Sequence, residues 1–114
     1  MTDCLFCKVY KKEIDAEIVY EDGNVIGFKD INPQAKTHLL FIHKTHSENI
    51  NQMVRISSSQ LNQVFSGIEK YTNENGIEDN GFRLVTNVGA SAGQSVFHTH
   101  IHLLSGERLG RFGS

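Results

Sequence analysis

The sequence has few cysteines, little net charge and no long apolar run. Two cysteines among 114 residues cannot supply a disulfide framework. No segment approaches ~18 uninterrupted apolar residues, and charge begins at Asp3, so we expect neither a membrane span nor a signal peptide. A net charge of −2 argues against a dedicated nucleic-acid binder, because such proteins usually carry a basic excess. These absences favour a single cytoplasmic domain over residues 1–114, with both cysteines as reduced thiols.

Short apolar segments predict an α+β domain with a five-stranded, mainly antiparallel sheet. The expected strands are residues 17–21, 25–29, 38–43 and 82–86, followed by a histidine-rich run that starts at residue 98. Asp22-Gly23-Asn24 predicts a hairpin turn between the first two. Because the strands do not alternate with helices, a parallel βαβ arrangement is disfavoured.

One short and one long helix are expected. The short helix covers residues 4–12, and the long one follows residue 57. Its apolar positions fall at i, i+3, i+4 and i+7: Leu61, Val64, Phe65 and Ile68. Ser57 and Gln60 have the spacing of a capping box, and Asn75-Gly76 predicts the end of this helix.

The run His98-Thr99-His100-Ile101-His102-Leu103-Leu104 holds half of the six histidines of the chain. Two is the period of a strand, so we expect the three rings to project from one face. Three interpretations are open: surface or structural histidines, a metal site, or covalent catalysis by an imidazole. The third is favoured, because the run follows a glycine-containing loop at residues 87–95 that suits phosphate binding. By itself that loop could equally be a simple connection.

This run resembles the His-φ-His-φ-His-φ-φ signature of the histidine triad (HIT) superfamily. The similarity extends over nearly the whole chain, through Leu5-Phe6, Glu21-Asp22, residues 28–35, Thr37-His38-Leu39, Lys44-Thr45-His46 and residues 93–97. It looks most like the Hint branch, the small purine nucleoside phosphoramidases, in a bacterial-type version. The resemblance implies hydrolysis of purine nucleoside 5′-phosphoramidates through a nucleotidyl-histidine intermediate, without an organic cofactor. It also implies a homodimer with a shared ten-stranded sheet. The apolar stripe of the long helix, Leu61 to Ile68, is a candidate interface element, but the same stripe could simply cover its own sheet.

The resemblance assigns roles to individual residues. His100 would be the nucleophile, with His102 close to the phosphate and His38 in a relay that keeps the nucleophile in the correct tautomer. Ser95 would help to protonate the departing amine. The substrate-binding residues would be Phe6, Phe28 and Ile31 around the base, Asp30 on the ribose, and Asn87, Gly93, Gln94, Ser95 and His102 around the phosphate.

The motif Cys4-Leu5-Phe6-Cys7 has three interpretations: a redox pair, half of a zinc site, or unoccupied thiols. Redox work is disfavoured because a βαβ context is absent. The similarity to bacterial-type HIT proteins implies a zinc ion on Cys4, Cys7, His46 and His98. Four protein ligands close the coordination sphere, so such a zinc would be structural. His43 remains as a structural or surface residue.

Three other functions remain open. One is a dinucleoside polyphosphate hydrolase of the same superfamily, and another is a nucleotide-binding regulatory module with weak turnover. The third is a zinc hydrolase that uses His98 and His100 as ligands.

Overall fold

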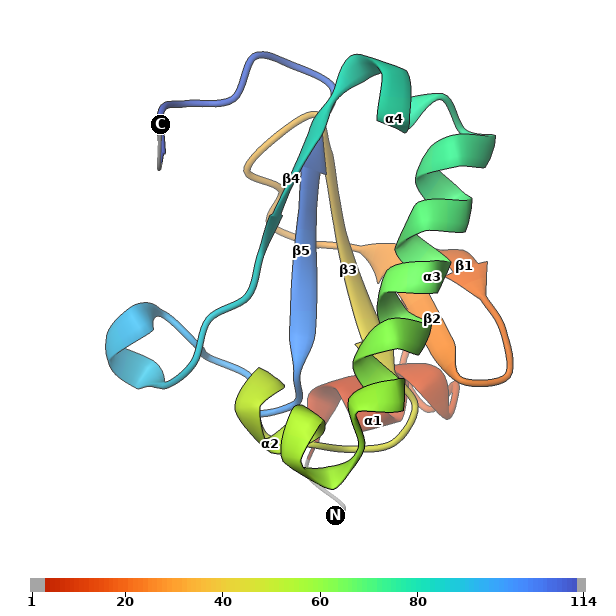
Figure 1. The fold of residues 1–114 in the computed structure, drawn as a ribbon, viewed down its shortest axis with the longest axis vertical. Helices are drawn as coiled ribbons and strands as arrows, with labels where there is room; N and C mark the ends of the chain where they lie inside the picture. The colour runs from red at the N-terminus through yellow and green to blue at the C-terminus, as the bar shows by residue number, and fades with distance from the viewer. Residues whose placement is uncertain (1–3, 113–114) are drawn as a thin grey trace.

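The computed structural model describes residues 4–112. Its centre is one antiparallel sheet of five strands in the order β1-β2-β3-β5-β4 (Figure 1). The strands are β1 (Ile18–Glu21), β2 (Val25–Lys29), β3 (Thr37–His43), β4 (Phe82–Val85) and β5 (His100–Ser105). The predicted α+β class with a five-stranded antiparallel sheet is therefore confirmed.

The helices are α1 (Leu5–Tyr10), α2 (Ile50–Ile56), α3 (Ser58–Glu74) and α4 (Ile77–Asn80). The long α3 runs beside β3, and α1 lies near the opposite end of the molecule from α4 (Figure 1). In the described part of the chain, no helix combines the length and apolar character that crossing a bilayer requires.

Strand alternation gives the sheet two different apolar faces. Leu39 and Phe41 of β3 pack with residues of α3, whereas Leu40 and Ile42 pack with residues of α1. On β5, Ile101 belongs to the α3 side. Side chains alternate along a strand, so His100 and His102 face the α1 side. The period-two pattern thus places both imidazoles on the face that α1 covers.

Three local predictions differ from the structure. Helices α2 and α4 were not predicted, because only Met53 of the seven residues of α2 is buried and none of the four residues of α4 is buried. The capping box does not form: the Ser57 hydroxyl contacts Ser59 Oγ at 2.7 Å, and Gln60 Oε1 has no hydrogen-bond partner. The last strand starts at His100, two residues after the predicted start at residue 98.

The predicted end of the long helix is confirmed. Helix α3 ends at Glu74, and Gly76 follows with a φ of 70°, a left-handed conformation that glycine adopts without strain.

Candidate active site and metal cluster

The candidate nucleophile His100 lies on β5 beneath the aromatic ring of Phe6 from α1. The two ring centroids are 5.0 Å apart, and Phe6 also packs edge-to-face on Phe28 of β2 at 5.4 Å. The His102 ring lies 5.0 Å from that of His100. Helix α1 and the sheet therefore bring two imidazoles and two aromatic rings together from segments far apart in the sequence.

A backbone carbonyl fixes the tautomer of His100. Its Nδ1 lies 2.7 Å from the carbonyl oxygen of His98, and a carbonyl can only accept, so Nδ1 carries the proton. The lone pair is then on Nε2. Desolvation by burial lowers the pKa of His100 below its usual 6.5, against the opposing effects of the His98 carbonyl and the charge of Asp30. At neutral pH the ring is therefore uncharged and nucleophilic.

A second hydrogen-bond chain orients His102. The backbone N–H of Gln34 donates to His38 Nδ1 at 3.0 Å, so the proton of a neutral His38 is on Nε2. That Nε2 lies 2.9 Å from His102 Nδ1, which must accept. His102 therefore keeps its proton on Nε2. Desolvation, with the neighbouring His100 and His38, lowers the pKa of His102 to about 4, so the ring is a neutral donor at pH 7.

This arrangement changes the relay implied by the resemblance. The hydrogen bonds of His38 join it to Gln34 and His102, and the carbonyl of His98 fixes the tautomer of His100. His38 therefore contacts His102 rather than His100. The alternation pattern gave no information about this difference, because it depends on a backbone amide four residues before His38.

Asp30 lies beside this chain. Its Oδ1 accepts from the Asn32 backbone N–H at 2.8 Å, and its Oδ2 is 3.4 Å from His38 Nε2. Donor atoms of Asp30, His38 and His102 lie within 4.8 Å of one another, close enough for a cation. However, His38 Nε2 carries a proton, so it offers no lone pair to a metal. This trio is better described as a carboxylate beside two hydrogen-bonded imidazoles.

Most of the predicted substrate-binding residues line one cavity of about 290 Å³. Its lining includes Phe6, Phe28, Asp30, Ile31, Ser95, His100 and His102. Ile31 is 90 % exposed and lies at the rim. An aromatic wall, a carboxylate and convergent imidazoles around one hollow are typical of a small-molecule site.

The expected role of Gln94 as a phosphate donor does not fit the structure. Its buried side chain accepts from the Gly89 N–H at 2.8 Å and donates to the carbonyls of Glu48 at 2.6 Å and Val96 at 3.2 Å. Those bonds use the side-chain oxygen and both amide protons of Gln94. Gln94 therefore stabilises the loop at residues 87–95 and has no side-chain donor left for a phosphate. Asn87 and Gly93 are neighbours in the same loop but do not line the cavity of His100.

The side chains of Cys4, Cys7, His46 and His98 form a compact cluster. The His98 Nδ1 atom lies 3.2 Å from Cys4 Sγ, 3.4 Å from Cys7 Sγ and 3.2 Å from His46 Nδ1. All four donor atoms fall within 4.8 Å of one another. Ideal tetrahedral geometry with Zn–N of about 2.0–2.1 Å puts two nitrogens about 3.3 Å apart. The four residues can therefore hold a metal ion, and the donor set suits zinc.

The protonation pattern of His98 agrees with a ligand role. Its Nε2 lies 2.9 Å from the carbonyl of His43, so it donates there and leaves the Nδ1 lone pair facing the two thiols. Burial lowers the pKa of His98 to about 4, which keeps this lone pair free at neutral pH. Burial also raises the pKa of Cys7 to about 11 in the metal-free chain, so a cation must displace that proton.

A contact between Ser47 and Thr99, which the sequence did not predict, stabilises this cluster. Ser47 Oγ lies 2.6 Å from Thr99 Oγ1, and the Thr99 N–H donates to the Ser47 carbonyl at 2.8 Å. These bonds tie the segment that carries His46 to the segment that carries His98. Thr99, a polar residue at a position expected to be apolar, was the available signal.

His43 lies on the other face of the sheet. Its Nδ1 accepts from the Thr45 N–H at 2.9 Å, and its Nε2 contacts Gln63 Oε1 of α3 at 2.7 Å. This hydrogen bonding gives His43 a structural role between β3 and α3.

A protein-family model described as the HIT domain matches residues 11–109. The chain belongs to the HIT family. Protein HitA of Neisseria gonorrhoeae is 40% identical over 104 residues, which cover 91% of this chain and 96% of that protein. The purine nucleoside phosphoramidase of Escherichia coli K12 is 36% identical over 108 residues, which cover 95% and 91%.

Solved structures agree with the family assignment. A HIT family hydrolase from Clostridium thermocellum is similar to this chain with a TM-score of 0.92 and 40% identity, covering 100% of this chain and 99% of that one. A histidine triad protein from Clostridium difficile has a TM-score of 0.93 and 35% identity, with 98% and 97% covered. The HIT proteins similar to this one therefore include hydrolases.

Proposed function

We propose that this HIT protein hydrolyses purine nucleoside 5′-phosphoramidates, of the adenosine 5′-monophosphoramidase type. The observation that carries the proposal is the state of His100. Its Nδ1 proton is held by a backbone carbonyl, and its Nε2 lone pair is free beside a cavity with an aromatic wall. The similar Escherichia coli protein is a purine nucleoside phosphoramidase, which agrees with this substrate class.

In the proposed first step, His100 Nε2 attacks the phosphorus and the P–N bond breaks. The imidazole gains a positive charge, which the carbonyl of His98 stabilises through the Nδ1–H. The leaving nitrogen takes up a proton through the hydroxyl of Ser95, since an amine anion is a poor leaving group. In the second step water attacks the phosphorus, releases the balancing proton and frees His100 from the nucleoside monophosphate.

The other residues bind and orient the substrate in this proposal. The His102 Nε2–H donates to a phosphate oxygen, and the hydroxyl and backbone of Ser95 face the remaining oxygens. Asn87 and Gly93 lie outside the cavity and shape the loop that carries Ser95. The base lies among Phe6, Phe28 and Ile31, and Asp30 accepts from the ribose hydroxyls. Preorganised donors of this kind stabilise charge at the phosphorus without reorganisation during the reaction.

The test of the function is a rapid-quench reaction with AMP-linked amines and, in parallel, dinucleoside polyphosphates. We expect cleavage of the P–N bond and a protein mass increased by one adenylyl group, located on His100. Cleavage of phosphate-linked substrates alone would replace the phosphoramidase assignment by a dinucleoside polyphosphate hydrolase. Binding of nucleotides without turnover of either class would favour a regulatory binding module.

The pKa shifts predict the pH dependence of this reaction. Attack requires neutral His100, whose pKa lies below 6.5. His102 Nδ1 accepts from His38 only while the His102 ring is neutral, and its pKa is about 4. We therefore expect kcat/KM to be near its maximum at pH 8 and to reach half of that maximum only below pH 6.5. A decline to half of the maximum already near pH 7.5 would contradict a depressed pKa of the nucleophile.

We propose that Cys4, Cys7, His46 and His98 hold a structural zinc ion. The bound metal would add a cross-link between α1 and the segment before β5. With four protein ligands it would offer no open position to a substrate, so no catalytic step is assigned to it.

We also propose a homodimer that continues the sheet to ten strands. In the described structure β4 pairs only with β5, so its other edge is open. Next to this edge, Phe82 of β4 and Phe65 of α3 are 37% and 44% exposed and line a shallow hollow with Leu84. An open edge bordered by apolar side chains is a surface that a second copy can cover.

Replacing Phe65 and Phe82 by glutamate should convert the dimer to a monomer. Two buried carboxylates on each side of a symmetric interface would repel and lose hydration. Light scattering after size exclusion measures the mass, and circular dichroism checks that the fold remains. An exposed substitution on the opposite side, Leu5→Glu, should leave the mass unchanged. Wild-type protein that is monomeric at micromolar concentration would refute the dimer.

A further inference from the structure

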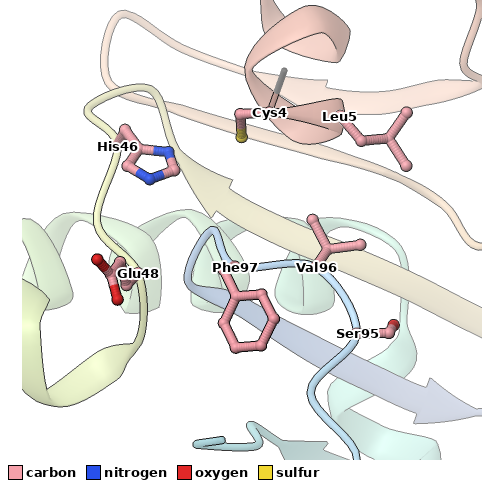
Figure 2. A pocket seen from close by; sticks show the side chains of 7 residues that line it. All are labelled: Cys4, Leu5, His46, Glu48, Ser95, Val96 and Phe97. Carbon is pink, nitrogen blue, oxygen red and sulfur yellow. The ribbon is translucent and has the colours of Figure 1, made fainter. Parts of the chain in front are cut away.

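A second cleft, of about 630 Å³, adjoins the cavity that contains His100. Its lining consists of Cys4, Leu5, His46, Glu48, Ser95, Val96 and Phe97 (Figure 2). Leu5, Ser95 and Val96 line both hollows, so the cleft and the cavity meet at these side chains. We propose that this cleft binds the leaving group of the substrate and selects amines that carry a second, distal positive charge. The inference rests on the proposed function, because it concerns the other half of the same substrate.

The position of the cleft fits a leaving group. In a displacement at phosphorus, the attacking and leaving atoms lie on opposite sides. His100 lines the cavity but not the cleft, and Ser95 stands between them. A leaving nitrogen that takes its proton through Ser95 therefore departs towards the cleft.

The walls of the cleft are mostly apolar. Leu5 is 47% exposed and Phe97 is 49% exposed, although both are large apolar side chains. In Figure 2, Phe97 lies between Glu48 and Ser95, with Cys4 and Leu5 along the opposite side. An alkyl chain attached to the leaving nitrogen would cover these two side chains and remove apolar surface from water.

The charge of the cleft comes from Glu48. Two thiolates neutralise a divalent zinc ion on the neighbouring cluster, so Cys4 and His46 add no net charge in the loaded protein. Glu48 is the one carboxylate among the seven lining residues. Among the described residues it forms no ion pair within 4.0 Å, in contrast to Glu21, which pairs with Lys12 and Lys44. An ammonium group at the far end of the leaving group would supply the missing partner.

The same charge disfavours anionic leaving groups. A nucleoside phosphate departing into this cleft would approach the Glu48 carboxylate and be repelled. The cleft thus separates amine-linked substrates from phosphate-linked ones, whereas the nucleotide cavity does not distinguish them.

Three matched AMP phosphoramidates test the inference. Their leaving groups are 1-aminopentane, 1,5-diaminopentane and 5-aminopentanoate, which are neutral, cationic and anionic at the distal end. We expect kcat/KM for the diamine to exceed that for the neutral amine about two- to five-fold, the range of an exposed ion pair, with the anion lowest. Glu48→Gln should abolish the ranking, so that the three compounds give kcat/KM values within the error of one another.

Glu74→Gln is the matched control. It removes the same charge at the last residue of α3, at the end of the molecule remote from α1 (Figure 1). This variant should keep the full ranking. Phe97→Ala should lower kcat/KM for all three pentyl compounds by a similar factor, because each loses the same apolar contact. Equal rates for the three compounds in the wild type, or a ranking that survives Glu48→Gln, would overturn the inference.

A binding measurement separates this inference from the proposed function. If none of the three compounds is cleaved, the phosphoramidase proposal fails. Their dissociation constants for the His100→Asn protein are then measured by calorimetry. Tightest binding of the diamine, lost on the further change Glu48→Gln, would still support the cleft as a cation-selective site. Equal affinities would overturn it.

Discussion

Replacing His100 by alanine is expected to lower the turnover of AMP phosphoramidates by roughly 10⁴-fold or more, the usual scale for loss of a nucleophile. The variant loses the Nε2 atom that attacks phosphorus in the proposed reaction. Phe6, Phe28 and Asp30 of the cavity remain, so nucleotide affinity should change only a few-fold. Steady-state kinetics measures the first quantity and calorimetry with AMP measures the second.

The matched variant is His100→Asn, whose side-chain amide can still donate to the carbonyl of His98. It should be as inactive as the alanine variant, because the hydrogen bond is retained but the nucleophile is not. Mass spectrometry of quenched wild-type protein should find the adenylyl group on His100 and on no other residue. Turnover within ten-fold of wild type in either variant would contradict the assignment.

Replacing Cys4 and Cys7 together by serine is expected to prevent zinc binding and to lower Tm by about 10 °C or more. The proposed zinc ion would cross-link α1 to the segment before β5, and metal-binding free energy in such sites is also folding free energy. The nucleophile keeps its contacts, so kcat/KM should fall less than the stability does. Elemental analysis gives the metal content and thermal unfolding gives Tm.

Zinc titration provides the control for this prediction. Added zinc should raise the Tm of metal-depleted wild-type protein and leave that of the double variant unchanged. A double variant with the zinc content of the wild type would contradict the metal proposal. Loss of zinc together with complete loss of turnover would instead favour a zinc hydrolase.

The sequence predicted the histidine face because period-two alternation is a local property. His100 and His102 share a face for the same reason that Ile101 packs against α3. The hairpin at Asp22 and the helix end at Gly76 were equally local, since each depends on a few turn residues. Helix α2 was not predicted because seven residues with one buried side chain show no helical periodicity of apolar residues.

The hydrogen bonds within the site could not be predicted in the same way. The proton positions on His38 and His102 follow from the N–H of Gln34, whose approach depends on the turn after β2. The side chain of Gln94 is fully hydrogen-bonded within the protein, and one of its partners is the carbonyl of Glu48, which is 46 residues away in the chain. The Cys-x-x-Cys spacing indicated only half of a metal site, and the resemblance supplied His46 and His98.

His98 takes part in both the Cys4-Cys7-His46 cluster and the surroundings of His100. Its ring faces Cys4 and Cys7, and its carbonyl oxygen holds the Nδ1 proton of His100. A rotation of this one peptide unit would therefore loosen the nucleophile and the metal cluster at once. Engineers who wish to alter catalysis without disturbing the scaffold should leave position 98 untouched, since losing its ring removes a potential metal ligand and can also shift the carbonyl that binds His100.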